Sequence, residues 1–224
     1  MRHTRYLFIL AMIIMTGCGS MPEAPSRGDN TIELPEDTRP QDKYSSINYE
    51  AENPDRYSVY LVDLDHYTTN GRYYHEKHEQ YLLGIAEILI QKYGYRLKDG
   101  SIGFYYDKVE NKKNKLYLGL DVVCDQAKLR NGEGYYESGR RMINVYLPSV
   151  LDTVRRYEEI LSENEVEGTV IGLLWYRVGQ GEFINIWLPK QNINEYFNDQ
   201  LTFNELILKA TITDKNGKKI RLTL

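Results

Sequence analysis

The amino-acid sequence predicts an α+β fold, in which a mainly antiparallel sheet carries helices packed on one face. Hydrophobic residues make up 42% and charged residues 27% of the 224 residues, a balance typical of a globular protein. Short segments rich in β-branched and aromatic residues follow one another, with segments of helical periodicity between them. The chain closes with two strand-like segments around Asn216 and Gly217, a dipeptide typical of tight hairpins. Neighbouring short strands of this kind pair antiparallel, and the helices between them cover one face of the sheet.

The first half of the predicted domain contains three strands and one long helix. The helix is predicted by an apolar stripe at spacings of four, three and four residues, and it ends before Gly94. The stripe consists of His78, Leu82, Ile85 and Leu89. We expect strands over residues 57–64, 101–106 and 115–124, the helix over residues 72–93, and a polar turn over residues 107–114.

The second half contains further strands, three helices and the terminal hairpin. We expect a long loop over residues 125–141 and a strand over residues 142–147. Pro148 then opens a helix that runs to about residue 163, because proline suits the first turn of a helix. The remaining elements are strands over residues 169–177 and 182–188, helices over 193–198 and 203–208, and hairpin strands over 210–213 and 219–224.

Two hexapeptides that lie 41 residues apart match in residue type at all six positions. Residues 143–148 read INVYLP and residues 184–189 read INIWLP, and a predicted helix follows each of them. One explanation is a duplicated strand–strand–helix unit, in which the first copy carries the longer inter-strand loop. The other is chance combined with shared local physics, since a strand that ends in Leu-Pro before a helix is a common arrangement. Two copies are too few for a solenoid.

The first 18 residues have the features of an export signal. A short basic segment at residues 2–5 precedes an apolar stretch of ten residues at 6–15. This stretch is too short to span a bilayer but has the length of the hydrophobic region of a signal peptide. Residues 15–18 read Met-Thr-Gly-Cys and resemble the lipobox of bacterial lipoprotein precursors, which reads Leu, a small residue, Gly or Ala, and Cys.

The resemblance implies that Cys18 becomes the first residue of the mature protein and carries fatty acyl chains such as palmitate. Several acyl chains together hold a protein stably on a membrane, where a single chain does not. The protein is then anchored by lipid outside the cytoplasm. In a Gram-negative host, Gly19 after the lipidated cysteine implies sorting to the outer membrane, facing the periplasm. The alternative is an ordinary secretory signal peptide with a chance cysteine.

The chain is therefore predicted to have three parts. Residues 1–17 form the signal peptide, residues 18–56 the lipidated cysteine and a disordered tether, and residues 57–224 a single α+β domain. Residues 19–56 hold five of the seven prolines, and their isolated apolar residues bury too little surface to offset the entropy of ordering. The formal net charge is −4, and −6 without residues 1–17. We expect no nucleic-acid partner, because the chain has no overall basic field.

All histidines of the predicted mature chain fall within thirteen residues. One interpretation is a zinc site in a metal-dependent hydrolase, with His75 and His78 one helical turn apart and His66 or Asp65 as further ligands. The other is that His75 and His78 extend the apolar stripe of the helix to the solvent edge of the core. We adopt the second interpretation, which requires no cofactor.

Tyrosine is unusually frequent, with 20 Tyr against 5 Phe and 2 Trp. Tyr135 and Tyr136 fall in the loop predicted over residues 125–141, where a core role is least expected. Tyrosine combines a large contact area with a hydroxyl group and therefore suits recognition surfaces. One interpretation is a surface that binds an envelope protein or a glycan. The alternative is a compositional bias of the genome.

The sequence contains no complete set of catalytic residues of a known type. Cys124 is predicted to be a small core residue, because it ends a strand of apolar neighbours and no histidine lies close to it. The leading hypothesis is a lipid-anchored, non-enzymatic envelope protein that binds a protein or glycan partner. A metal-dependent hydrolase that uses the histidines is the alternative, and a purely structural envelope spacer is the third.

Overall fold

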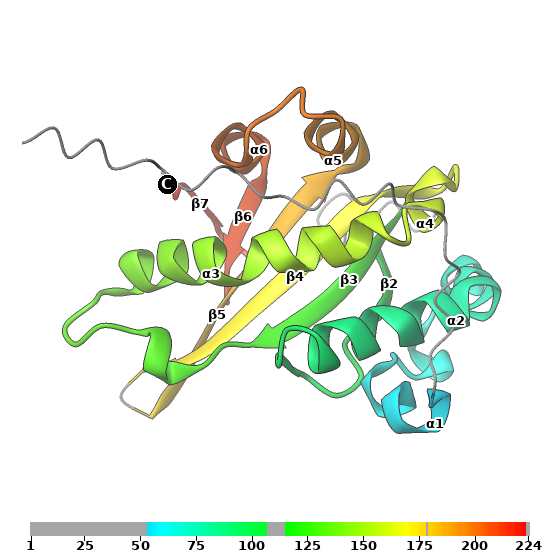
Figure 1. Cartoon of the computed structure of the whole chain (residues 1–224), viewed down its shortest axis with the longest axis horizontal. Coiled ribbons are helices and arrows are strands. Elements are labelled where there is room, and N and C mark those ends of the chain that lie inside the picture. The colour runs from blue at the N-terminus through cyan, green and yellow to red at the C-terminus, as the bar shows by residue number, and fades with distance from the viewer. Residues whose placement is uncertain (1–52, 107–114, 178, 223–224) are drawn as a thin grey trace, which may run out of the picture. The chain divides into compact units, whose positions relative to one another are not determined.

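A seven-stranded sheet is the central element of the fold (Figure 1). The computed structural model describes residues 53–106, 115–177 and 179–222. The strand order is β1-β3-β4-β5-β6-β7, with β2 also paired to β3, and every pair is antiparallel except β3 and β4. The strands are β1 (Arg96–Leu97), β2 (Gly103–Tyr106), β3 (Leu116–Val123), β4 (Val166–Arg177), β5 (Gln180–Pro189), β6 (Thr211–Asp214) and β7 (Lys219–Ile220). The predicted α+β class with a mainly antiparallel sheet is confirmed.

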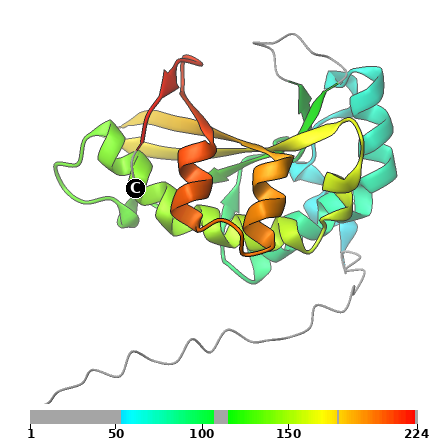
Figure 2. The same cartoon turned by 90° about the horizontal axis from the view of Figure 1, so that it is seen from above.

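The helices pack on one face of this sheet, as predicted. In Figure 2, α3, α5 and α6 lie along the same face, and α2 packs beside α3 and over β2. The helices are α1 (Pro54–Tyr57), α2 (Thr69–Gln91), α3 (Tyr135–Arg155), α4 (Glu159–Ser162), α5 (Lys190–Phe197) and α6 (Phe203–Lys209).

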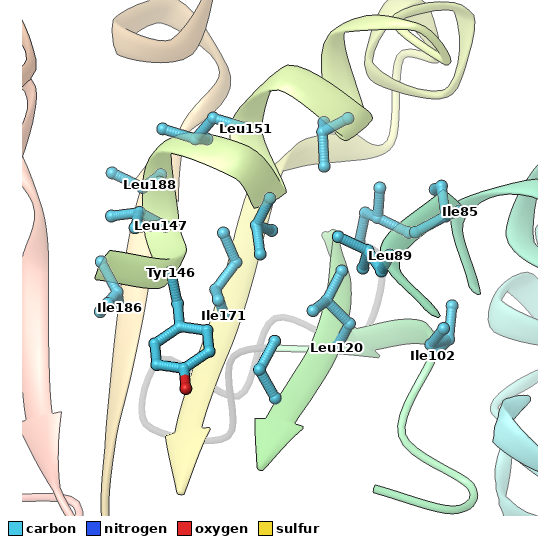
Figure 3. Packing of buried hydrophobic residues seen from close by; sticks show 14 of the residues in the cluster. Ile85, Leu89, Ile102, Leu120, Tyr146, Leu147, Leu151, Ile171, Ile186 and Leu188 are labelled. Carbon is cyan, nitrogen blue, oxygen red and sulfur yellow. The ribbon is translucent and has the colours of Figure 1, made fainter. Parts of the chain in front are cut away.

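The hydrophobic core fills the space between the helices and this face. Figure 3 shows Leu147 of α3 beside Ile186 and Leu188 of β5, and Leu89 of α2 beside Leu120 of β3. All five side chains are buried, and each such side chain stabilises the fold by about 1.5–3 kcal/mol. Because successive strand residues point to opposite faces, the residues between them lie on the other side of the sheet.

The helix predicted over residues 72–93 is confirmed as α2, which begins slightly earlier, at Thr69. The side chain of Thr68 caps it by accepting a hydrogen bond from the N–H of Gly71 at 3.3 Å. The backbone departs from helical geometry at His78, with φ of −115° and ψ of 17°, so α2 is kinked there. Gly94 follows with a positive φ of 65°, which suits the residue after a helix end.

The strand predicted over residues 142–147 is wrong, because these residues lie inside α3. Pro148 lies in the interior of the same helix, and the loop predicted over residues 125–141 contains the 3-10 turn η3 (Gln126–Lys128) and the first turns of α3. An apolar stripe with helical spacing runs through the proline without interruption and faces the sheet. It consists of Met142, Ile143, Tyr146, Leu147, Val150, Leu151 and Val154, all of them buried. Burial of this stripe outweighs the roughly 3 kcal/mol that proline costs in a helix interior.

The two matching hexapeptides adopt different structures. Residues 143–148 are helical in α3, whereas residues 184–189 are extended in β5. The predicted duplication of a strand–strand–helix unit is therefore wrong as a description of the fold. The same residue types are compatible with a helix and with a strand, because Ile143 and Leu147 share a helix face while Ile184 and Ile186 share a strand face.

The strand predicted over residues 57–64 is also wrong. The chain passes from α1 into the 3-10 turns η1 (Ser58–Tyr60) and η2 (Leu64–His66). Leu61 makes a single parallel bridge to Ile102, and the N–H of Val62 donates to the Ile102 carbonyl at 2.9 Å. Whether residues with a high β-propensity form a strand depends on the neighbouring strand with which they can pair. This segment forms a single bridge.

The other predicted elements agree with the structure within a few residues. The strands over residues 101–106, 115–124, 169–177 and 182–188 correspond to β2, β3, β4 and β5, and the helices over 193–198 and 203–208 correspond to α5 and α6. The terminal hairpin is confirmed as β6 and β7, with Gly217 in its turn at a φ of 76°. The predicted turn over 107–114 lies outside the described residues.

Candidate functional site

The face of the sheet opposite the helices is here called the open face. Among the described residues, no helix packs over it (Figure 2). Its side chains alternate along the strands with the buried ones and include several aromatic and polar residues. They are Tyr105 of β2, Tyr117, Gly119 and Asp121 of β3, Val170 and Gly172 of β4, and Phe183, Asn185 and Trp187 of β5.

A pocket of about 350 Å³ lies on the open face. Lys98, Tyr105, Asp121, Asn185 and Trp187 are among the residues that line it. The volume lies at the lower end of the range of roughly 300–1,000 Å³ typical of small-ligand sites. A lining of aromatic surface with a few polar groups is also typical of such sites, so this pocket is the candidate functional site.

Two glycines allow larger side chains to lie flat on the floor of the pocket. A Cβ atom at Gly119 would lie 2.3 Å from Cδ2 of Tyr105, and a Cβ atom at Gly172 would lie 2.1 Å from Oδ1 of Asp121. Both distances are far shorter than a van der Waals contact, so a side chain at either position would displace its neighbour. The Tyr105 ring therefore lies over Gly119, and the Asp121 carboxylate lies over Gly172.

Asp121 is the acidic group of the pocket. Its Oδ2 lies 3.4 Å from Nζ of Lys98, and its backbone N–H donates to Oγ of Ser101 at 3.2 Å. Burial raises the pKa of the Asp121 carboxyl above its ordinary value, and the nearby Lys98 offsets this effect in part. A carboxyl group kept where its charge is disfavoured is a common feature of functional sites.

Asn185 completes a row of residues across three strands. Asp121 pairs in register with Gly172, and Gly172 pairs with Asn185. Oδ1 of Asn185 would lie 3.3 Å from a Cβ atom at Gly172, so two side-chain oxygens converge above this glycine. Within the described part of the chain, the Asn185 carboxamide makes no hydrogen bond and is free to bind a ligand.

Aromatic surface lies next to this polar row. The rings of Tyr117 and Trp187 meet edge to face, with centroids 5.1 Å apart and an interplanar angle of 86°. Val170 lies between Gly119 and Trp187 in the sheet register. The site therefore combines an apolar surface with hydrogen-bonding side chains and can hold a ligand that has one apolar and one polar side.

A larger cavity of about 990 Å³ lies beside α2 and α3, and three of the four tyrosines that line it are engaged in contacts within the fold, Tyr176 being the fourth. The Tyr93 hydroxyl donates to Asp152 at 2.5 Å, and the Tyr146 hydroxyl accepts from the Asp125 N–H at 2.7 Å. The rings of Tyr95 and Tyr146 have centroids 4.9 Å apart. These contacts join the segments that follow α2 and β3 to α3, so packing explains Tyr93, Tyr95 and Tyr146 without a ligand.

The structure places His75 and His78 at the buried side of α2. Nδ1 of His75 lies 3.0 Å from the Tyr67 hydroxyl, which also accepts a hydrogen bond from the N–H of Phe104. Nε2 of His78 lies 2.9 Å from Oε1 of Glu163. Both rings therefore have hydrogen-bond partners that connect α2 to its neighbours, as expected for histidines at the edge of the core.

His66 and Asp65 lie apart from these two rings, in the exposed turn η2. Asp65 accepts a hydrogen bond from Arg72 at 3.3 Å. Across residues 53–106, 115–177 and 179–222, no three His, Cys, Asp or Glu side chains are placed so that they could hold a metal ion. The structure thus does not bring the proposed zinc ligands together.

We expect the protein to become less stable as the pH falls below about 6.5. Burial lowers the pKa of both His75 and His78 below the ordinary value of 6.5. The unfolded chain then binds more protons than the folded chain, so acidification favours unfolding. Urea unfolding from about pH 7.5 to about pH 5.5 measures this dependence.

The double variant His75→Asn and His78→Gln should show a weaker pH dependence, because Asn and Gln do not titrate. The matched control is His66→Gln, since His66 is exposed. An equal pH dependence in the double variant and in the wild type would contradict the assignment to these two histidines.

Tyr135 and Tyr136 lie in the first turn of α3 and not in a loop. The Tyr135 hydroxyl donates to the carbonyl of Phe183 at 2.8 Å, and its ring centroid lies 5.5 Å from that of Trp175. Tyr135 therefore connects α3 to the sheet. Tyr136 is 53% exposed, and a role in partner binding stays a prediction for it.

Of the two cysteines, Cys124 lies within the described residues and Cys18 does not. Cys124 is buried at the end of β3, and burial raises the pKa of its thiol to about 12. It therefore remains protonated at neutral pH and acts as a small core residue. Cys18 lies outside the described residues, so its lipidation stays a prediction. No helix within the described ranges is long and apolar enough to cross a membrane.

Comparison of this chain with known protein families, curated proteins and solved structures found no match.

The sequence analysis did not predict a site on the open face, although the residues of this face follow a simple pattern. Tyr117, Gly119 and Asp121 alternate with leucines along β3, and Phe183, Asn185 and Trp187 alternate with buried residues along β5. Period-two alternation of this kind identifies a face, but strand pairing is needed to bring two such faces together.

Proposed function

We propose that this protein is a lipid-anchored protein of the bacterial cell envelope, whose domain binds an envelope ligand on the open face without catalysing a reaction. The lipobox-like sequence that ends at Cys18 supports the anchor, and the proline-rich residues before α1 support a tether between membrane and domain. The predicted tether boundary at residue 56 falls inside α1 (Pro54–Tyr57). The mature protein would then present its domain outside the cytoplasm.

One observation carries the binding role. The open face holds a pocket in which the side chains of Asp121 and Asn185 stand beside aromatic surface, and the raised pKa of the Asp121 carboxyl indicates that the charge is costly there. A carboxyl group whose charge is disfavoured by burial is a common mark of a binding or catalytic site.

The metal-dependent hydrolase has less support. It requires His75 and His78 as ligands, and both rings already make hydrogen bonds, to Tyr67 and Glu163. Each ring uses one of its two nitrogens in these hydrogen bonds, and among the described residues no third His, Cys, Asp or Glu is placed to complete a metal site with them.

Photo-crosslinking in living cells tests the binding role. A benzophenone amino acid replaces Phe183 on the open face in one variant and Leu208 of α6 in the other. Leu208 is 66% exposed and lies on the helical side of the domain, so it is the control for an accessible position away from the open face. We expect a defined adduct of higher mass from position 183 and none from position 208.

Mass spectrometry then identifies the crosslinked species. Adducts of equal yield from both positions, or adducts from position 208 alone, would contradict a binding role for the open face. The absence of any adduct from position 183 would contradict it as well, because a bound ligand would lie within reach of that side chain.

A further inference from the structure

The polar row of the open face presents two hydrogen-bond acceptors that are not used within the fold. Oδ1 of Asp121 and Oδ1 of Asn185 converge from β3 and β5 over Gly172, at 2.1 and 3.3 Å from the position of a Cβ atom there. Among the described residues, neither oxygen accepts a hydrogen bond. Two acceptors so close together suit two donors on one ligand, for example neighbouring hydroxyl groups.

The charges of the pocket favour a neutral ligand. Lys98 and Asp121 are the charged residues of its described lining, and they form an ion pair at 3.4 Å. An anion would be attracted by Lys98 and repelled by Asp121, and a cation would meet the opposite combination. For an ion, the attraction by one residue and the repulsion by the other largely cancel. A neutral ligand is not repelled by either residue and can still donate to the carboxylate in a charge-assisted hydrogen bond.

Aromatic rings border the polar row. Trp187 lies in β5 two residues from Asn185, and Tyr117 of β3 packs against it edge to face. Tyr105 lies flat over Gly119, one step along β3 from Asp121 on the same face. Aromatic faces carry partial negative charge and attract the weakly positive C–H groups of a ligand.

We propose that this pocket binds a neutral sugar ring of a glycan chain, with the C–H face of the ring against Trp187 and its hydroxyl groups donating to Asp121 and Asn185. A sugar ring has one apolar face and an edge of hydroxyl donors, which matches the aromatic surface and the polar row. This inference rests on the proposed function and adds the chemical class of the ligand.

Titration of the purified lipidated protein tests the inference. The protein is kept in a detergent without a sugar headgroup and is titrated by calorimetry with three neutral hexasaccharides, chitohexaose, cellohexaose and maltohexaose. We expect at least one of them to bind with a Kd of about 0.1 mM. Trp187→Ala and Asp121→Asn should each weaken this binding about tenfold or more.

Additional variants separate binding from folding. Gly172→Ala should weaken binding because its methyl group displaces the Asp121 carboxylate, whereas Trp187→Phe should keep most of the affinity because it keeps an aromatic face. Asp121→Asn should not reduce stability at neutral pH, since a carboxyl whose pKa is raised by folding destabilises the ionised folded state. Asn144→Ala, at an exposed position of α3, is the matched control and should bind like the wild type.

Three results would overturn the inference. They are no binding of any hexasaccharide at millimolar concentration, unchanged binding in both Trp187→Ala and Asp121→Asn, and an equal loss of binding in Asn144→Ala. If position 183 crosslinks to an envelope protein while no hexasaccharide binds, the inference fails and the proposed function stands. If position 183 yields no adduct and no hexasaccharide binds, both fail.

Discussion

Trp175→Ala is expected to reduce the free energy of unfolding by about 3–5 kcal/mol, the largest stability effect that we predict for a single substitution. The Trp175 side chain is 0% exposed, and its ring lies beside Tyr135 at the start of α3. Its Nε1–H donates to Oε2 of Glu182 at 3.0 Å, and Glu182 is itself almost fully buried. The substitution therefore leaves a cavity and also removes one hydrogen bond from a buried carboxylate.

Urea unfolding of the purified protein measures the effect. Tyr176→Ala is the matched control, because Tyr176 is the next residue of β4, points to the open face and is 48% exposed. We expect this control to cost less than about 1 kcal/mol. Trp175→Phe should give an intermediate loss, since it fills most of the cavity but cannot donate to Glu182. Equal losses from Trp175→Ala and Tyr176→Ala would show that Trp175 does not hold α3 on the sheet.

Cys18→Ser is expected to abolish the attachment of lipid. The thiol of Cys18 is the group to which the resemblance to lipoprotein precursors assigns the acyl chains, and a serine hydroxyl at this position does not replace it. Growth with alkyne-labelled palmitate should label the wild-type protein, and the signal should fall to background in Cys18→Ser. Residues 1–17 should also remain attached, so the variant should run as a heavier precursor.

Cys124→Ser is the matched control for this experiment, since it removes the other cysteine and should keep the label. In addition, a chain in which an ordinary secretory signal peptide is joined to Gly19 should leave the membrane fraction, because it lacks the acyl chains that hold the protein. Palmitate label on Cys18→Ser, or membrane association of the chain that begins at Gly19, would contradict the predicted anchor.

The regular elements were predictable wherever local pattern and tertiary environment agree. The stripe that begins at His78 is buried against the sheet, and Gly94 follows the helix, so α2 could be located from spacing alone. The hairpin at Asn216 and Gly217 was predictable because glycine adopts the positive φ that its tight turn requires.

The failures came from segments whose residues suit two structures. Residues 143–148 and 184–189 contain the same residue types, yet one is helix and the other strand. Isoleucine and leucine are buried with a period near 3.6 in the first case and a period of 2 in the second. A segment of six residues is too short to distinguish a period near 3.6 from a period of 2. The secondary structure of each hexapeptide therefore depends on the longer stripe of α3 and on the pairing of β5 with β4 and β6.

The candidate site also depended on tertiary structure. Asp121 and Asn185 lie 64 residues apart in the sequence, and each alone appears as an ordinary polar residue on the solvent side of a strand. They become neighbours because β4 enters the sheet between β3 and β5 in a register that places Gly172 between them. Glycine at that position leaves the space into which both side chains extend.

The sequence by itself determined the α+β class, α2 and the C-terminal hairpin, because these follow from local periodicity and turn chemistry. It also led to the predicted lipid anchor, which depends on a short linear motif and not on a fold. The tertiary structure alone decided the helical state of residues 142–147 and the composition of the open face. The physical reason is that burial and strand register arise from contacts between residues distant in the chain, and these contacts select among conformations that the local sequence allows about equally.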